Sequence, residues 1–348
     1  MIIQKLSPFI FFMKTYNNLW KEFISISNFV KAYKDARKGK GKQQSVKDFK
    51  NGWALKLYRL RKDVIDGKFH TSPYRSMKIY EPKERIIYKL PFNPDRIVQH
   101  AIVNIISPIL ERKFISDTYS CISNRGQIKA SQRCMKAVRK NKYCLKCDIH
   151  HFYPSIDQNI LSNMFHKIIK DKKFMQVLDD VIFSFKGDKN APIGNYLSQW
   201  CGNFYLSSLD NFIKRELKIK DYIRYCDDFM LFENNKTYLH FCRKEIEKYI
   251  HENLLLEFSK SDLFNVKQGV DFCGYRHFNN FILLRKSTKL RQKKRIIKMF
   301  RDFNNKKKIE YYRHSLASMK GWLIHAKTKN LIKQWNINKL ELLLYTKK

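Results

Sequence analysis

A pair of adjacent aspartates stands inside an apolar stretch of the chain. The segment reads Tyr225-Cys226-Asp227-Asp228, and residues 223–232 predict a strand, a turn and a returning strand. Neighbouring carboxylates repel each other unless a cation lies between them. Oxygen ligands held close together suit Mg²⁺. The segment therefore indicates a divalent-metal site at a hairpin turn, and the alternative is an ordinary acidic turn between two strands.

A third aspartate belongs to an earlier predicted strand. Residues 143–149 alternate in character, so that Leu145 and Cys147 face one way and Asp148 faces the other. A two-metal site for phosphoryl transfer needs carboxylates from separate strands, because each ion contacts substrate phosphates as well as protein. Asp148 would complete such a site with the hairpin pair. Its alternative interpretation is the N-cap of a following helix.

The charge of the chain predicts a polyanionic partner. Lys and Arg number 70 and Asp and Glu number 31 among 348 residues, which gives a net charge of +39 and a pI near 9.9. This balance opposes compaction unless nucleic acid neutralises it, and binding should weaken steeply with salt. A basic ribosomal or membrane-surface protein could share the charge. The 14% of aromatic residues instead favours a protein that stacks on bases.

The eight cysteines are scattered along the sequence. Cys144 and Cys147 have CxxC spacing, but they lie in a predicted strand and no second pair or His cluster completes a zinc site. We expect reduced thiols in a cytoplasmic protein. No apolar run reaches the length of a membrane span. Met1 and Met13 are both candidates for the natural start.

The remaining periodicities predict a mixed architecture. A strand, a turn at Pro82 and a returning strand are expected over 77–90. Apolar spacing and helix-end signals predict helices over 13–37, 53–64, 95–110, 194–217 and, in a densely basic form, 285–308. The order of elements indicates an α+β core followed by a helical C-terminal part.

The ordered set of segments resembles reverse transcriptases over nearly the whole chain. Tyr225-Cys226-Asp227-Asp228 is similar to their Tyr-x-Asp-Asp box, and Asp148 with the Phe-Tyr-Pro-Ser-Ile text of 152–156 is similar to their first aspartate motif. Three further segments match as well: 82–85, 95–99 and 269–275. The resemblance implies an α+β right-hand polymerase with fingers, a palm of antiparallel sheet plus helices, and a helical thumb. The boundaries expected from it are a basic helical extension over 1–45, fingers over 46–142, palm over 143–280 and thumb over 281–348.

The resemblance also implies roles for single residues. Asp148, Asp227 and Asp228, with the backbone of Ile149, would hold two Mg²⁺ ions, for which Mn²⁺ can substitute. Lys260 would protonate the leaving pyrophosphate. The residues expected at the nucleotide are Lys83, Arg85, Ile193, Gly194 and Tyr153, the last as steric gate. The expected primer grip is Cys273, Gly274 and Tyr275.

Without the resemblance, the same residues could have purely structural roles. Lys83 and Arg85 could form a solvated basic turn, and Lys260 could be one surface lysine among many. Tyr153 could be a buried palm aromatic, and Ile193 could be a packing residue at a helix entry. The basic run 285–308 could follow a phosphate backbone or form a solvated helix face.

One group of family members is most similar, the reverse transcriptases of diversity-generating retroelements. Ile193 stands where most reverse transcriptases carry Gln, and Gln199 stands where most carry Pro. One departure is the Arg-Gly-Gln-Ile-Lys-Ala text of 125–130, where members more often have Lys-Gly-Thr-His-x-Ala. The resemblance implies cDNA synthesis that is error-prone at adenines of a template-repeat RNA and serves diversity generation by retrohoming.

The partners implied are template RNA, the primer–cDNA duplex, dNTPs and a small, basic, oligomeric accessory protein, with no membrane. The alternatives are another bacterial reverse transcriptase, either group II intron-like or defence-associated, and a catalytically inactive RNA-binding scaffold.

Overall fold

The structure is a computed structural model that describes residues 14–80 and 84–346. The chain divides into two compact units. The first contains the described residues up to Phe114 together with His150–Leu209 and Tyr249–Glu257. The second contains Ile115–Ile149, Asp210–Lys248 and the described residues from Phe258 onward. The division into an extension, fingers, palm and thumb stays a prediction.

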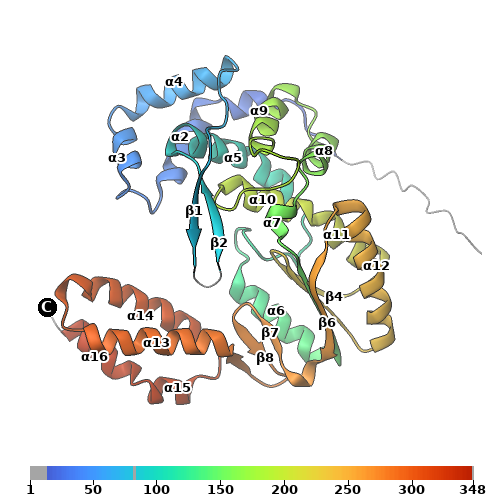
Figure 1. Cartoon of the computed structure of the whole chain (residues 1–348), viewed down its shortest axis with the longest axis vertical. Coiled ribbons are helices and arrows are strands. Elements are labelled where there is room, and N and C mark those ends of the chain that lie inside the picture. The colour runs from blue at the N-terminus through green and yellow to red at the C-terminus, as the bar shows by residue number, and fades with distance from the viewer. Residues whose placement is uncertain (1–13, 81–83, 347–348) are drawn as a thin grey trace, which may run out of the picture. The chain divides into compact units, whose positions relative to one another are not determined.

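The first unit is mainly helical (Figure 1). Its strands are the antiparallel hairpin of β1 (Arg75–Ile79) and β2 (Arg85–Lys89). The predicted turn at Pro82 lies outside the described residues. The helices of this unit, with the turn η1, are α1 (Leu19–Phe23), α2 (Ile26–Arg37), α3 (Gln44–Lys50), α4 (Trp53–Ile65), η1 (Phe92–Arg96), α5 (Ile97–Glu111), α7 (Phe152–Ser155), α8 (Gln158–Ile168), α9 (Lys172–Ile182) and α10 (Tyr196–Tyr205).

The apolar helix α5 forms the centre of this unit. It packs against α2 and α10, and most of its side chains are buried. The single helix predicted over 13–37 was wrong, because Ser25 adopts an extended conformation between α1 and α2. Its side chain accepts a hydrogen bond from the backbone N–H of Asn28, so Ser25 is an N-cap that starts a new helix. This cap explains why the helix is interrupted at Ser25.

The second unit is built on an antiparallel sheet with strand order β4-β5-β3-β6. Helix α6 (Gln127–Lys140) lies against β4, and its apolar residues join those of the strands in one core. The strands alternate between core and solvent only in part, since β5 is buried at four successive positions. The bounds are β3 (Tyr143–Ile149), β4 (Asp221–Tyr225), β5 (Asp228–Glu233) and β6 (Phe258–Asn265), with α11 (Ser207–Asn211), η2 (Phe212–Glu216) and α12 (Lys236–Leu254).

The helix predicted over 194–217 is interrupted. It consists of α10, α11 and η2 rather than one continuous helix. Ser207 donates its hydroxyl to the carbonyl of Phe204, so a side chain competes for the backbone at the end of α10. Gly194 lies before the first of these segments with a φ of 120°, a conformation that glycine tolerates.

The C-terminal part of the second unit holds a small sheet and a helical bundle. Strands β7 (Val270–Phe272), β8 (Tyr275–His277) and β9 (Ile282–Leu284) pair in that order. In Figure 1 the orange and red helices α13, α14 and α16 lie side by side, and their apolar faces share one core. The bounds are η3 (Val266–Gln268), α13 (Lys286–Asp302), η4 (Lys306–Lys308), α14 (Ile309–Leu323), α15 (Lys329–Gln334) and α16 (Ile337–Thr346).

The α+β class is confirmed by these mixed helices and antiparallel sheets. The basic helix expected over 285–308 ends at Asp302. Among the helices of the described ranges, none combines the length and the apolar character needed to cross a membrane.

Candidate functional site

Two aspartates face each other across neighbouring strands. Asp148 of β3 is the direct register partner of Asp228, the first residue of β5. Directly paired residues of an antiparallel sheet project from the same face, so the two carboxylates leave the sheet together. Tyr225 is the register partner of Asp228. The two residues between them, Cys226 and Asp227, therefore form the hairpin turn. The interpretation of Asp148 as a helix N-cap was wrong, since His151 holds that position before α7.

Strand β6 supplies the other neighbours of Asp148. Lys260 is the register partner of Asp148 on that side, so this predicted residue does lie beside the aspartates and is exposed there. Ser259 donates its hydroxyl to Oδ2 of Asp148 at 2.6 Å. The pairing is irregular between Asp148 and Ile149, where the register shifts. Such an irregularity redirects the side chains at the end of a strand.

Asp228 has one satisfied and one unsatisfied oxygen. Its Oδ2 lies 3.2 Å from Nζ of Lys146, which also donates to the carbonyl of Asp271 at 2.6 Å. Its Oδ1 is inaccessible to solvent and has no hydrogen-bond partner among the described residues. Burial raises the pKa of Asp228 to about 6; Lys146 opposes the rise, and the carboxylates of Asp148 and Asp227 add to it.

The donor set suits a hard divalent cation. Three carboxylates from β3, β5 and the turn between β4 and β5 are hard oxygen ligands, and the orphaned Oδ1 of Asp228 is a buried acceptor without a donor. Within the part of the chain that the structure describes, no group of three or more His, Cys, Asp or Glu side chains has already converged on one point. The chemistry of the donors therefore fits Mg²⁺.

A buried ion pair holds the turn that carries Asp227. Arg224 donates to the carbonyl of Cys226 at 3.0 Å and pairs with Asp210 at 2.6 Å, and both side chains of the pair are fully buried. Asp210 also accepts hydrogen bonds from the hydroxyls of Tyr222 and Thr118. A charge pair this deep is tolerable only with such additional partners. The conformation of the turn therefore depends on residues that the sequence did not single out.

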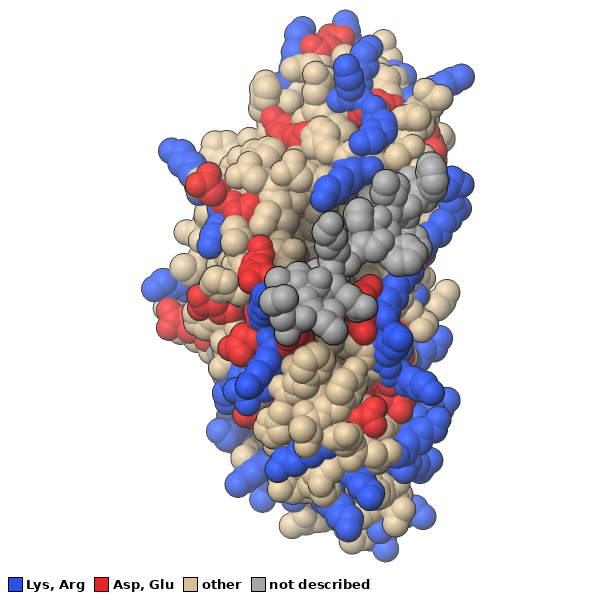
Figure 2. All heavy atoms as spheres, turned by 90° about the vertical axis from the view of Figure 1, so that its right-hand side faces the viewer, with Lys and Arg blue, Asp and Glu red and all other residues tan. Residues whose placement is uncertain are grey.

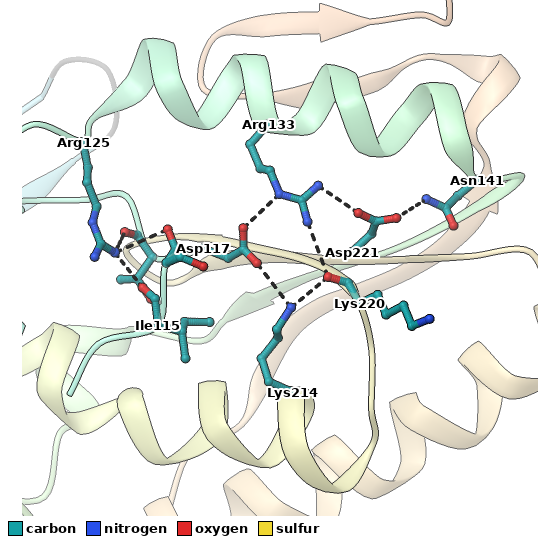
Figure 3. Close-up of polar contacts among 10 residues, drawn as sticks. Ile115, Asp117, Arg125, Arg133, Asn141, Lys214, Lys220 and Asp221 are labelled. Atoms are coloured by element: carbon teal, nitrogen blue, oxygen red, sulfur yellow. Dashed lines mark hydrogen bonds and ion pairs between the residues drawn. The ribbon is translucent and has the colours of Figure 1, made fainter. Parts of the chain in front are cut away.

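The segment before α6 runs alongside β4 and is fixed by ion pairs (Figure 3). Arg133 of α6 points between Asp117 and Asp221 and contacts each at 2.9 Å. Lys214 approaches Asp117 from the opposite side, at 3.3 Å. Arg125 donates to the carbonyls of Ile115 and Thr118. These contacts anchor the edge of the sheet beside the aspartate hairpin.

The predicted primer-grip residues form a tight turn between β7 and β8. Cys273 and Gly274 have φ values of 48° and 80°, as a two-residue hairpin turn of this type requires. Gln127 donates to the carbonyl of Cys273 at 2.5 Å, which gives the unusual text at 125–130 a structural role. A Cβ on Gly274 would lie 2.5 Å from the ring of Trp322. Tyr275 is fully buried and donates its hydroxyl to the carbonyl of Trp322.

Several predicted nucleotide residues come together in the first unit. The backbone of Tyr153 accepts a hydrogen bond from Ala191, and the carbonyl of Ile193 accepts one from Tyr88 of β2. A Cβ on Gly194 would lie 2.3 Å from the carbonyl oxygen of Tyr88, so only glycine allows this approach. Tyr153 and Ile193 are half-buried.

Of the two cations predicted to bind the triphosphate, only Arg85 lies within the described residues. Arg85 begins β2 and is exposed. Lys83 lies outside the described residues. A pocket that the sequence did not predict is bordered by Gly194 and Ile87. Cations from four elements and a loop line it: Lys40, Lys56, Arg75, Lys89 and Arg96.

Basic side chains cover the outer face of α13. Its buried face is formed by Thr288, Gln292, Ile296 and Met299. The exposed positions include Leu290 and Ile297 between cations. Lys and Arg side chains also spread over much of the molecular face drawn in Figure 2. The exposed cations of α13 are Lys286, Lys289, Arg291, Lys293, Lys294, Arg295, Lys298 and Arg301.

Comparison with known proteins decides the family. Residues 81–277 match the family model described as "Reverse transcriptase (RNA-dependent DNA polymerase)", which is more than half of the chain. The chain belongs to the reverse transcriptase family. The matched range contains the aspartate pair, Asp148 and the primer-grip turn, so the site described above lies inside the family domain.

Similar proteins include reverse transcriptases and intron proteins. The chain is 29% identical over 165 residues to the Retron Ec73 reverse transcriptase of Escherichia coli, covering 44% of this chain and 50% of that protein. It is 22% identical over 220 residues to the Group II intron-encoded protein LtrA of Lactococcus lactis subsp. cremoris, covering 60% and 37%. It is 24% identical over 172 residues to the Putative COX1/OXI3 intron 2 protein of Saccharomyces cerevisiae, covering 47% and 20%. The chain thus spans a fifth to a half of these relatives.

Proposed function

We propose that this chain is an RNA-directed DNA polymerase whose catalytic site is formed by Asp148, Asp227 and Asp228. The observation that carries the proposal is the register of Asp148 with Asp228, with Asp227 in the adjoining turn. In this arrangement the carboxylates of separate strands project from one face of the sheet. A two-metal site for phosphoryl transfer needs carboxylates from separate strands. On this proposal 46–142 are the fingers, 143–280 the palm, 281–348 the thumb and 1–45 a basic extension.

The three aspartates and the carbonyl of Ile149 would hold Mg²⁺, or Mn²⁺ in its place. The bound ions would supply Lewis acidity that acidifies the primer 3′-hydroxyl and stabilises the departing pyrophosphate. The residues of the chain keep the site ready for this. Ser259 orients the Asp148 carboxylate, and Lys146 balances the charge of Asp228. Lys260, which pairs in register with Asp148, would protonate the pyrophosphate.

The nucleotide would be selected by residues of the first unit. The ring of Tyr153 would occupy the space of a ribose 2′-hydroxyl, and Lys83 and Arg85 would bind the triphosphate. Ile193 would contact the incoming nucleotide through its side chain, and Gly194 keeps the backbone close to β2. The cationic pocket beside Gly194 adds positive charge for phosphates.

Template and primer strands would be held by charge and by the primer grip. The exposed cations of α13 can follow a phosphate backbone, and Leu290 and Ile297 offer apolar contact between them. Cys273, Gly274 and Tyr275 would position the primer terminus. A protein with a net charge of +39 binds nucleic acid without strong sequence preference, so template choice would come from elsewhere.

Within the family we propose a reverse transcriptase of the diversity-generating retroelement type. The support is Ile193 and Gln199 in place of the usual Gln and Pro. This role adds a template-repeat RNA, a small basic oligomeric accessory protein and a cytoplasmic location. Similarity to a retron reverse transcriptase and to an intron-encoded protein supports the second candidate, a reverse transcriptase of one of those kinds.

Sequencing of cDNA made by the wild type and by Ile193→Gln separates the two candidates. Ile193 has no hydrogen-bonding group, so correct and incorrect base pairs differ less in how well they are held. A loss of about 1.4 kcal/mol of discrimination raises errors roughly tenfold. We expect frequent misincorporation opposite template adenine in the wild type and fewer such errors in Ile193→Gln, with other template bases nearly unaffected. Equal adenine error rates in both proteins would count against the mutagenic role of Ile193.

A further inference from the structure

Two cysteines share one hydroxyl group at the aspartate hairpin. Ser120 Oγ lies 3.3 Å from Sγ of Cys121 and 2.8 Å from Sγ of Cys226. Cys226 precedes Asp227 in the turn, and Cys121 comes from the segment that runs alongside β4. The two thiols are far apart in the sequence, but the fold of the second unit brings both within reach of the same oxygen.

Both cysteines adopt a backbone conformation that cysteine rarely takes. The φ of Cys121 is 55° and that of Cys226 is 56°, in the left-handed region that favours glycine or asparagine. Such conformations cost free energy and persist where the surrounding structure holds them, often at functional sites. The surrounding structure therefore fixes the backbone of both cysteines and holds the two sulfurs near one another.

Accessibility separates Cys121 from the other thiols. It is exposed, while Cys226 and Cys273 are half-buried. The other five cysteines are buried: Cys134, Cys144, Cys147, Cys201 and Cys242. The thiols of Cys121 and Cys226 are also hydrogen-bonded to each other, so their two sulfurs are in direct contact. Burial raises the pKa of Cys134 and Cys144, so those thiols are unreactive by comparison.

We propose that Cys121 and Cys226 are an oxidative modification site, at which a peroxide converts the two thiols into a disulfide next to Asp227. The Cys121 sulfur attacks one peroxide oxygen, the O–O bond breaks, and sulfenic acid forms. The Cys226 sulfur then gives up its proton and attacks the sulfenic sulfur. The S–O bond breaks and water leaves. With hydrogen peroxide, two thiols and one peroxide yield one disulfide and two waters.

The disulfide would move the turn that carries Asp227. A disulfide holds its sulfurs about 2.05 Å apart, which is much closer than two thiols that share a hydrogen-bonded hydroxyl. Because Cys226 adjoins Asp227, we expect closure to shift the carboxylate, and a displacement of about 1 Å at a reacting centre can cost on the order of 10²-fold in rate. Oxidation would thus switch polymerisation off reversibly. This consequence rests on the proposed function, whereas the disulfide itself does not.

Peptide mass spectrometry tests the disulfide directly. The reduced full chain is treated with hydrogen peroxide, its remaining thiols are alkylated, and the peptides are analysed without reduction. We expect a Cys121–Cys226 linked peptide as the main product. A main product that links Cys121 to Cys273, or sulfinic acid at Cys121 without any link, would overturn the proposal.

Primer extension tests the consequence with a matched control. Oxidised wild type should extend at least tenfold more slowly than reduced wild type and recover with dithiothreitol. Cys121→Ser replaces an exposed residue outside the proposed catalytic machinery, so it should extend normally and resist peroxide. Full activity of the linked protein, or equal peroxide sensitivity of Cys121→Ser, would contradict the switch. A reduced wild type that never extends a primer would instead refute the proposed function, and the linked peptide would still decide the modification site.

Discussion

The ammonium of Lys146 lies 3.2 Å from Oδ2 of Asp228. Lys146 precedes Asp148 by two residues on strand β3. The same ammonium donates to the carbonyl of Asp271, so one lysine links the central carboxylate to strand β7. Lys146 therefore balances the charge of Asp228, and it leaves Oδ1 of that carboxylate unsatisfied. An arrangement of this kind predicts competition between proton, lysine and divalent cation for one carboxylate.

Stabilisation of the protein by Mg²⁺ should depend on pH. The pKa of Asp228 is raised from 3.8 to about 6, so the folded protein binds the proton more tightly than the unfolded chain. Without metal, the contribution of Asp228 to stability therefore falls as pH rises from about 4 to 6. Mg²⁺ needs the ionised carboxylate, so the rise in Tm on adding Mg²⁺ should be larger at pH 7.5 than at pH 5. Asp228→Asn should reduce that rise at pH 7.5, and an equal rise at both pH values in the wild type would argue against this ligand.

The Arg224–Asp210 pair should dominate the stability of the hairpin. Arg224→Met leaves Asp210 buried without its cation, which typically costs about 3–5 kcal/mol. The double variant Arg224→Met with Asp210→Leu should regain part of that loss, because no charge is left buried. Urea unfolding of the wild type, both single variants and the double variant measures the coupling. Our interpretation is refuted by an Arg224→Met protein within about 1 kcal/mol of the wild type.

The primer-grip turn should tolerate only glycine at position 274. Gly274→Ala forces a φ of 80° on alanine, which costs roughly 1–2 kcal/mol, and its Cβ would meet the Trp322 ring. We expect lower stability and faster dissociation of a template–primer duplex. Gly321→Ala is the matched control, since it lies beside Trp322 in α14 with nothing within 4 Å of its Cβ. That control should be neutral or stabilising by up to about 1 kcal/mol. Equal stability and equal duplex dissociation of the two variants would show that the contact with the Trp322 ring does not exclude a side chain at position 274.

Tyr153→Ala should admit ribonucleotides by removing the ring expected at the 2′-hydroxyl. The ring packs against Gly202, where a Cβ would lie 3.2 Å from it, so the position of the ring is set by the helix behind it. Tyr153→Phe keeps the ring and should keep discrimination. Rates of incorporation of rNTPs and dNTPs by the three proteins provide the measurement. Unchanged discrimination in Tyr153→Ala would mean that another residue is the gate.

Local patterns were enough to predict the elements that carry the aspartates. Alternation in 143–149 and the apolar runs around Asp227 and Asp228 predict β3, β4 and β5, and the structure confirms these strands. The sequence placed Asp228 at the turn, whereas it begins β5. The shift arises because the turn needs only two residues, and Cys226 accepts a positive φ.

Non-local relationships could not be predicted in the same way. The register of Asp148 with Lys260 is set by the pairing of β3 and β6, which no local pattern reports. The pairing of Arg224 with Asp210 likewise joins a strand to a separate helix. Lys146 is different, since its spacing of two from Asp148 puts both on one face of a strand and could have been used.

The most direct measurement is primer extension on an RNA template in Mg²⁺ by the wild type and by Asp227→Asn. We predict that the wild type synthesises DNA and that Asp227→Asn loses at least about 10²–10³-fold in rate, because the lost charge is one the ions need. Circular dichroism and RNA binding should stay unchanged in the variant, since asparagine keeps the size of the side chain in this turn. Extension by Asp227→Asn within tenfold of the wild type would contradict the site, and a wild type that makes no DNA on any RNA template with Mg²⁺ or Mn²⁺ would contradict the proposed activity.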